Sequence, residues 1–315
     1  MQVGFVGLGN VGGKLSGSLI RKGMDVSVHD LSADLVAEKV AAGAQDGISP
    51  RDLMRSCDAV ITCLPSPAAS AAVLDEMLPE IAPGKIWMEM STTDAAEVQR
   101  LGKLVIEKGG EAVDCPVSGG CHRAATGNIA ILAGCERKTF DRILPLLTTM
   151  GRRILHTGDL GSASVLKVVT NYLATANLVS IAEALTVCKA QGFDMGVAYE
   201  AIAMSSGTSF VAETEGQVIL NGSRDISFTM DLVAKDIGLF QEVADRAGVK
   251  LELSPLLIEI FRDGIERYGP RELSPNIIKR LEDQTGLDVT WPGFPPEMID
   301  DEPEEPGYEI TRNNG

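Results

Sequence analysis

The sequence predicts an α/β protein in which a doubly wound parallel sheet is followed by an all-α domain. Over about the first 155 residues, apolar segments alternate with helical patterns, which is typical of βαβ units. A glycine-rich turn separates the first predicted strand from the first helix. From residue 163 onward, helical patterns follow one another without a strand between them, as in an all-α domain.

The glycine-rich turn is a G-x-G-x-x-G fingerprint that follows a short apolar strand beginning at Val3. In such a fingerprint one glycine permits the tight turn, one lets the backbone approach a pyrophosphate, and one allows close packing of helix and strand. The following helix, predicted at 13–22, offers N–H groups and its dipole to the anion. This context predicts a Rossmann dinucleotide-binding domain. The predicted cofactor-binding residues of the turn are Gly7, Gly9, Asn10, Val11 and Gly12.

A second strand, predicted at 25–29, ends at Asp30, which lies 18 residues after Gly12. An acid at about this distance hydrogen-bonds the ribose hydroxyls of adenosine in Rossmann units. Its negative charge would repel the 2′-phosphate of NADP. The sequence therefore predicts NAD as the cofactor, with NADP disfavoured by Asp30.

The remaining strands place further residues at one edge of the sheet. A helix is predicted at 33–42, and strands are predicted at 59–64, 86–90, 111–115, 130–132 and 153–156. Ligands of doubly wound sheets bind beyond the carboxyl ends of the strands. Leu64-Pro65, Ser91-Thr92 and the segment 116–120 fall at such ends.

The second half is predicted to be helical. One unbroken pattern, without Pro or Gly, covers 163–191. Further helices are predicted at 195–204, 209–220, 230–247, 255–268 and 274–284. The predicted organisation is a cofactor domain at 1–162, an all-α substrate and dimerisation domain at 163–286, and an acidic, Pro-rich tail at 287–315.

The composition argues against several function classes. The net charge is −16, and no basic stripe that could bind nucleic acid is evident. Residues 281–315 contain ten acidic side chains and one Arg, so this end of the chain is expected to be a solvated tail. No apolar run reaches the length of about 18 residues that a membrane span needs, and the first strand begins too early to leave room for a signal peptide. Six cysteines without C-x-x-C and three histidines without H-x-x-x-H predict reduced thiols, a cytoplasmic protein and no metal site.

Lys167 and Asn171 are four residues apart on the long predicted helix, so they share one face. The neighbours of Lys167 in sequence are apolar, and burial lowers the pKa of a lysine because it desolvates the charged form. A lysine tuned in this way accepts the proton of an alcohol while a hydride leaves the carbon. Asn171 would orient the hydroxyl group. The alternative is a surface lysine whose head group reaches solvent.

Ser118, Gly119 and Gly120 follow the strand predicted at 111–115. Consecutive N–H groups in such a turn can curl around an anion. The functional interpretation is a site for a substrate carboxylate. The alternative is an ordinary glycine-rich turn.

Taken in order, these motifs resemble the β-hydroxyacid dehydrogenase family, which includes 3-hydroxyisobutyrate dehydrogenases and tartronate semialdehyde reductases. The resemblance covers about residues 1–270. It rests on the fingerprint, Leu64-Pro65, Ser91-Thr92, the segment 116–120, the series Gly158…Gly161…Lys167…Asn171, and Phe228 followed by Lys235-Asp236.

The resemblance implies a role for each matching residue. It implies an N-terminal domain of the 6-phosphogluconate dehydrogenase type, with Leu64, Pro65, Ser91 and Thr92 at the cofactor. Lys167 would be the general acid/base, and Asn171 would bind the substrate. Ser118, Gly119 and Gly120 would hold the substrate carboxylate. Lys235 would reach the active site or the cofactor, with an exposed salt bridge to Asp236 as the alternative.

The chain departs from the family pattern at Arg123, which replaces a glycine. Arginine suits bidentate capture of a carboxylate, sulfonate or phosphate. The hypothesis is that Arg123, together with His122, contacts a second polar or anionic group of the substrate. A solvent-exposed arginine is the alternative.

The sequence therefore predicts an oxidoreductase that transfers a hydride between NAD and a small, 3-hydroxyisobutyrate-like β-hydroxy acid. The rate of substrate oxidation should rise with pH as Lys167 loses its proton. The alternatives are a semialdehyde or imine reductase on the same fold, and a non-catalytic NAD-sensing protein. A homodimer or homotetramer is also predicted, with Trp291 and Phe294 as an arm that clasps a neighbouring subunit.

Overall fold

The computed structural model describes residues 1–311. The chain divides into two compact units. Unit 1 comprises residues 1–167 and the segment from Asp300 on, and unit 2 comprises Val168–Ile299. The first boundary therefore falls five residues later than the sequence predicts, inside the long helix.

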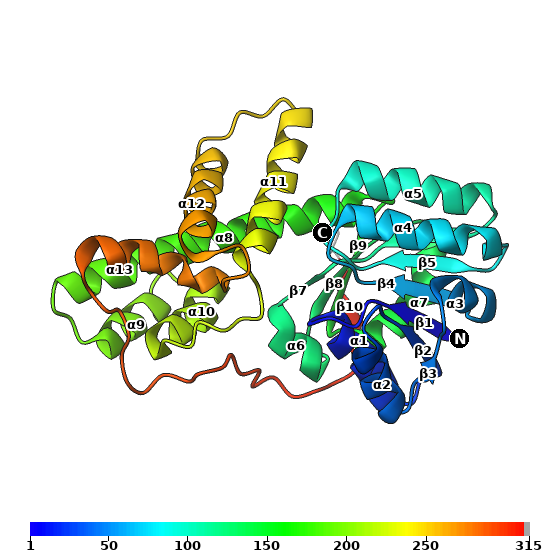
Figure 1. Ribbon diagram of the computed structural model, residues 1–315, viewed down its shortest axis with the longest axis horizontal. Helices are drawn as coiled ribbons and strands as arrows, with labels where there is room; N and C mark the ends of the chain where they lie inside the picture. Colours follow the sequence, from blue (N-terminus) through cyan, green and yellow to red (C-terminus); the bar gives the residue numbers. More distant parts are fainter. Residues whose placement is uncertain (312–315) are drawn as a thin grey trace. The chain divides into compact units, whose positions relative to one another are not determined.

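Unit 1 contains a ten-stranded, mostly parallel sheet (Figure 1). Six parallel strands lie in the order β3-β2-β1-β4-β5-β6, so the predicted doubly wound order is confirmed. These strands are β1 (Val3–Val6), β2 (Val26–His29), β3 (Gln45–Asp46), β4 (Ala59–Thr62), β5 (Ile86–Glu89) and β6 (Glu111–Asp114).

The far side of the sheet departs from a purely parallel arrangement. Strand β8 (Ala130–Gly134) runs antiparallel to β6, and the short β7 (Val117–Ser118) runs antiparallel to β8. Strands β9 (Arg153–Gly158) and β10 (Tyr308–Glu309) then continue the sheet in parallel with β8. The sequence did not predict β3, β7 or β10, because each has only two residues and carries no periodic pattern.

Helices cover both faces of the sheet, because successive strand residues point to opposite sides. Along β4, Ala59 and Ile61 pack with side chains of α1 (Gly12–Arg21) and α7 (Arg137–Met150). Val60 packs on the other face with side chains of α3 (Pro50–Ser56), α4 (Pro67–Met77) and α5 (Ala95–Glu107). Ser49, Ser66 and Asp94 begin three of these helices by accepting a backbone hydrogen bond at the N-cap. The helices are α1 (Gly12–Arg21), α2 (Ala33–Ala41), α3 (Pro50–Ser56), α4 (Pro67–Met77), η1 (Leu78–Glu80), α5 (Ala95–Glu107), α6 (Gly120–Thr126) and α7 (Arg137–Met150).

Unit 2 is helical, as predicted. The long helix α8 (Ser162–Ala190) begins in unit 1 and continues into unit 2, where Leu178, Ile181 and Leu185 join the core. The other helices are α9 (Met195–Ala203), α10 (Phe210–Asn221), α11 (Met230–Arg246), α12 (Leu253–Tyr268), η2 (Ser274–Ile278) and α13 (Lys279–Thr285). By length and composition alone α8 is long and apolar enough to cross a membrane, a possibility that the sequence analysis did not recognise. The core helix of a soluble protein passes the same test.

The expectation of a solvated acidic tail is wrong. Residues before Asp300 pack on unit 2, where Val289 is fully buried and the Trp291 N–H donates to the Leu220 carbonyl (N···O 2.7 Å). Trp291 and Phe294, the predicted intersubunit arm, pack against this core of their own chain. From Asp300 on, the chain joins unit 1 and supplies β10. The acidic side chains are held there by basic residues of unit 1, which a count of charges cannot reveal.

Candidate active site

The glycines of the fingerprint meet different steric demands. Gly7 has a positive φ of 94°, and a Cβ there would lie 2.3 Å from the Cys63 carbonyl oxygen. A Cβ on Gly12 would lie 2.0 Å from the Gly7 carbonyl oxygen. At Gly9 a Cβ would meet no described atom within 4 Å. Packing therefore requires Gly7 and Gly12, whereas the open space beside Gly9 fits the close approach of a pyrophosphate. These residues fit a dinucleotide.

The Asp30 carboxylate lies against this turn. Its Oδ2 accepts a hydrogen bond from the Leu8 N–H (2.7 Å), and its Oδ1 accepts one from the Ser32 N–H (2.8 Å). Two backbone donors thus fix an anionic group at the end of β2, beside the turn. This is the geometry in which an acid can also receive hydrogen bonds from ribose hydroxyls.

The loops after β4 and β5 are fastened to each other. The Leu64 N–H donates to Ser91 Oγ (2.7 Å), and the Ser91 N–H donates to Glu89 Oε1 (2.8 Å). Thr62 Oγ1 donates to the other carboxylate oxygen of Glu89 (3.1 Å). Burial raises the pKa of Glu89, although these hydrogen bonds oppose the shift. The sequence analysis missed Glu89; the available signal was an acid at the end of an apolar strand.

Ser118, Gly119 and Gly120 form the turn from β7 into α6. Gly119 and Gly120 both have positive φ values, 126° and 87°. Side chains other than glycine rarely adopt this backbone region, so the turn depends on the two glycines. Leu64-Pro65, Ser91-Thr92 and this turn all follow carboxyl ends of strands within unit 1, as predicted.

Arg123, on α6, has carboxylate partners within the chain. Its Nη2 lies 3.0 Å from Glu302 Oε1, and its Nε lies 3.9 Å from Asp300 Oδ1. The side chain is 24% exposed, so Arg123 is not the free surface arginine of the alternative interpretation. Its predicted contact with a substrate anion stays a prediction.

Asp114 anchors the beginning of α8. Its side chain is fully buried, and its two oxygens accept hydrogen bonds from the Gly161 and Ser164 N–H groups (2.8 and 2.7 Å). A negative charge at a helix N-terminus is stabilised by the helix dipole. Lys167 follows on this helix and is only 8% exposed, in agreement with the expected apolar surroundings. The sequence analysis gave Asp114 no role, since its partners come from a distant segment.

Asn171, Lys235 and Asp236 meet in unit 2. The Asn171 amide donates to Asp236 Oδ2 (2.5 Å), and Lys235 Nζ lies 2.9 Å from Asp236 Oδ1. The Asp236 side chain is 2% exposed and that of Lys235 is 24% exposed, so this ion pair is not the exposed salt bridge of the alternative interpretation. One buried carboxylate orients both of the polar side chains that the resemblance assigns to the site.

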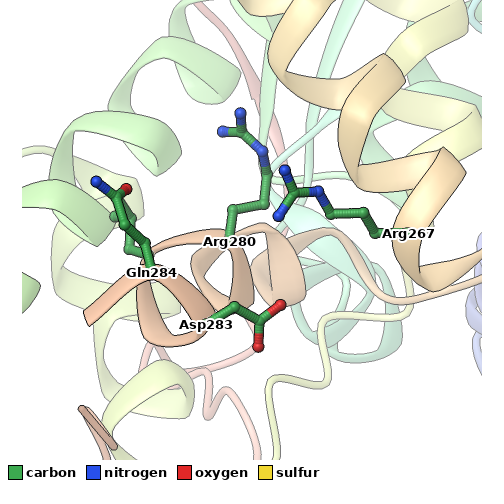
Figure 2. Close-up of a pocket in the computed structure, with 5 residues that line it drawn as sticks. Arg267, Arg280, Asp283 and Gln284 are labelled. Carbon is green, nitrogen blue, oxygen red and sulfur yellow. The ribbon is translucent and has the colours of Figure 1, made fainter. Parts of the chain in front are cut away.

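A polar cavity of about 320 Å³ elsewhere in unit 2 does not contain these residues (Figure 2). It is formed by α12 and α13, and its arginines, Arg267 and Arg280, both donate to Asp263. Since none of the predicted site residues lines this cavity, it has no part in the chemistry described below.

Comparison with known proteins accounts for the organisation of the chain. Residues 2–158 match the NAD-binding domain of 6-phosphogluconate dehydrogenase, and residues 161–281 match the NAD-binding domain of NADP-dependent 3-hydroxyisobutyrate dehydrogenase. A 2-(hydroxymethyl)glutarate dehydrogenase of Eubacterium barkeri is 32% identical over 294 residues, covering 92% of this chain and 98% of that protein. An NAD-dependent L-serine dehydrogenase of Pseudomonas aeruginosa is 33% identical over 295 residues, covering 90% and 98%.

The structural comparison agrees. A 3-hydroxyisobutyrate dehydrogenase from Salmonella typhimurium superposes with a TM-score of 0.81 at 26% identity, covering 89% of this chain and 99% of that one. The matches extend across both units, and the N-terminal domain is an NAD(P)-binding domain. The chain is an oxidoreductase that belongs to the β-hydroxyacid dehydrogenase family.

Proposed function

We propose that this protein is an NAD-linked dehydrogenase of small β-hydroxy acids in which Lys167 is the general acid/base. The observation that carries the proposal is the placement of Lys167. It is buried on α8, the first turn of that helix is anchored by Asp114, and Asn171 lies one turn further along the same face. Asn171 is in turn held by Asp236.

NAD is the proposed cofactor, because the Asp30 carboxylate lies at the turn where a 2′-phosphate of NADP would bring further negative charge. When bound, NAD would supply the hydride acceptor for oxidation and the hydride donor for reduction. Gly7, Gly9 and Gly12 would admit its pyrophosphate, and Asp30 would bind its ribose hydroxyls. Leu64, Pro65, Ser91, Thr92 and Lys235 complete the proposed cofactor contacts.

In the oxidation, the Lys167 amine takes the hydroxyl proton as the carbon gives up its hydride, which leaves a carbonyl group. In the reduction, the Lys167 ammonium returns the proton to the forming alkoxide. Asn171 orients the reacting oxygen by a hydrogen bond. Ser118, Gly119 and Gly120 hold the substrate carboxylate. Holding the substrate at this second point orients its hydroxyl group toward Lys167, and such orientation lowers the barrier of the reaction.

The names of the relatives suggest a substrate class. 2-(Hydroxymethyl)glutarate, L-serine and 3-hydroxyisobutyrate share the unit HOCH₂–CH(R)–COO⁻, in which R is carboxyethyl, ammonium or methyl. We propose a 3-hydroxypropanoate with a substituent at carbon 2. Because Glu302 and Asp300 neutralise Arg123, a neutral R group is favoured over an anionic one unless the substrate displaces those carboxylates.

The test measures the rate of NAD reduction with 2-(hydroxymethyl)glutarate, L-serine and 3-hydroxyisobutyrate as substrates. The wild-type chain is compared with the Lys167→Ala variant. Wild-type turnover is expected with at least one acid. Lys167→Ala should lose about two to four orders of magnitude in kcat, with the Kd of NAD within threefold. Near-normal turnover of the variant would contradict the proposed role. Turnover only with semialdehydes or imines would favour the reductase, and tight NAD binding without any turnover would favour the NAD-sensing protein.

A homodimer or homotetramer is proposed from the surface of unit 2. Large apolar side chains are exposed there, among them Val187 (61%), Phe193 (57%), Val197 (63%) and Met204 (85%). Large exposed apolar side chains are typical of subunit interfaces when they gather on one surface, as Phe193 and Val197 do in lining one pocket. Light scattering of the purified chain tests this: a monomer at micromolar concentration would contradict it. The six cysteines form no disulfide within the described residues 1–311, which supports the proposal of a cytoplasmic protein; cell fractionation tests this.

A further inference from the structure

The segment 300–310, here called the C-terminal strap, is bound along unit 1. Its strand β10 pairs with β9, with Tyr308 opposite Arg153 and Glu309 opposite Ile154. The Ile310 N–H donates to the Ile154 carbonyl (2.7 Å). The strap lies beyond residue 281, where the family match ends. It is therefore an addition to the matched part of the chain, and its contacts need an explanation of their own.

The beginning of the strap holds the end of helix α6. Asp300 Oδ2 accepts a hydrogen bond from Asn128 Nδ2 (2.8 Å) and another from Thr126 Oγ1. The Asp300 side chain is only 2% exposed. Burial raises the pKa of Asp300, but the hydrogen bonds from Thr126 and Asn128 outweigh it, and the pKa is lowered. Asn128 Nδ2 also donates to the Glu302 carbonyl (2.8 Å).

Glu302 joins α6 to the sheet. Its Oε1 lies 3.0 Å from Arg123 Nη2 on α6, and its Oε2 lies 3.1 Å from Arg153 Nη2 at the beginning of β9. One carboxylate thus bridges two guanidinium groups on different elements. Together with Asp300, it fastens Arg123, Thr126 and Asn128 to the edge of the sheet.

Helix α6 needs such support. It has seven residues, and a helix of this length is not stable without tertiary contacts. It begins at Gly120, directly after Gly119, and the backbone of both glycines can adopt many conformations, so the turn alone does not fix the direction of the helix. Further polar contacts come from α1, where Ser18 Oγ and Arg21 Nη2 donate to the Ala124 and Ala125 carbonyls (3.3 and 2.8 Å).

We propose that Asp300 and Glu302 are positioning residues for substrate binding. By fixing α6, they hold Ser118, Gly119 and Gly120 in the conformation that receives the substrate carboxylate. The inference rests on the proposed function for the identity of that ligand. The positioning itself is a property of the free protein and can be measured without substrate.

The experiment compares Glu302→Gln and Asp300→Asn with Glu305→Gln in the full chain. Glu305 belongs to the same strap but pairs with Arg152, away from α6, and is the matched control. The two test variants should raise the KM for the hydroxy acid about threefold to tenfold, with kcat and the Kd of NAD within twofold, because a uniform binding contact is lost. Amide hydrogen exchange in 118–128 should become faster in both, and remain unchanged in Glu305→Gln.

A third test variant, Gly307→Ala, detaches the strap without changing its charges. A Cβ on Gly307 would lie 2.0 Å from the Gly151 carbonyl oxygen, so Gly307→Ala displaces β10. It should reproduce the faster exchange and the higher KM.

The outcomes separate the two proposals. Unchanged exchange in 118–128 in all three test variants would overturn the positioning role, even if their melting temperatures fall. Faster exchange with an unchanged KM would also overturn it, because the strap would then be structural only. If the wild type turns over no hydroxy acid, the proposed function fails, and the exchange data still decide whether the strap orders the turn.

Discussion

The Asn171 amide donates a hydrogen bond to the buried Asp236 carboxylate, with an Nδ2···Oδ2 distance of 2.5 Å. The other carboxylate oxygen lies 2.9 Å from Lys235 Nζ. Asp236 therefore holds two side chains that the proposed function places at the active site. The NH₂ group of an amide has a second N–H, which can donate a hydrogen bond to the reacting oxygen of the substrate.

Asp236→Ala should lower kcat/KM about tenfold to a hundredfold, because it leaves buried partners of a charged group unsatisfied. The Kd of NAD should rise more than threefold, because Asp236 holds Lys235, which is a proposed cofactor contact. Steady-state kinetics and NAD titration measure both. Asp245→Asn, an exposed acid on the same helix, is the control and should remain within twofold of wild type.

Gly9→Ala and Gly12→Ala should fail in different ways. A Cβ added at Gly9 meets no described atom within 4 Å, so the free energy of unfolding should change by less than about 1 kcal/mol. The Kd of NAD should nevertheless rise at least about tenfold, since that space is where the pyrophosphate approaches. Gly12→Ala places a Cβ 2.0 Å from a backbone oxygen and should lower the melting temperature. Calorimetry and NAD titration separate the two; unchanged NAD binding in Gly9→Ala would argue against this pyrophosphate position.

Asp30→Asn should shift cofactor preference toward NADP. The amide oxygen can still accept the hydrogen bond from the Leu8 N–H, whereas the hydrogen bond from the Ser32 N–H and the negative charge are lost. The ratio of kcat/KM for NAD to that for NADP should fall about tenfold or more, given the cost of placing like charges together. A ratio unchanged from wild type would mean that Asp30 does not face the adenosine ribose.

Glu215 on α10 should make stability depend on pH. Its Oε2 is buried without a hydrogen-bond partner among the residues described, and burial raises its pKa to about 8. Between the unfolded pKa and this value the folded state holds a proton that the unfolded state has lost, so stability falls as pH rises. Glu215→Gln should unfold like wild type near pH 5 and be more stable at pH 9 by a few kcal/mol, at about 1.4 kcal/mol per unit of pKa shift. Denaturant unfolding at both pH values measures this. Glu200→Gln, an exposed acid on α9, should show no such difference.

The sequence analysis succeeded where a local pattern is sufficient. The alternation of apolar strands with helical patterns and the glycine fingerprint predicted the sheet of unit 1, and the long Ala- and Leu-rich pattern predicted the helices of unit 2. Hydrophobic periodicity and turn residues are local signals that can be read over a few residues. The spacing of Lys167 and Asn171 predicted their shared helix face for the same reason. The two-residue strands escaped prediction, since nothing in two residues distinguishes a strand from a loop.

The sequence by itself determined the cofactor fold and which polar residues follow the carboxyl ends of the strands, where the proposed function places the ligands. Only the tertiary structure decided how these residues are held: Glu89 between two strand ends, Asp114 at the start of α8, Asp236 against Asn171, and Asp300 with Glu302 on α6. Each is a carboxylate whose partners are distant in sequence or on another element. Its role depends on burial and on hydrogen-bond distance, which folding creates and residue order does not reveal.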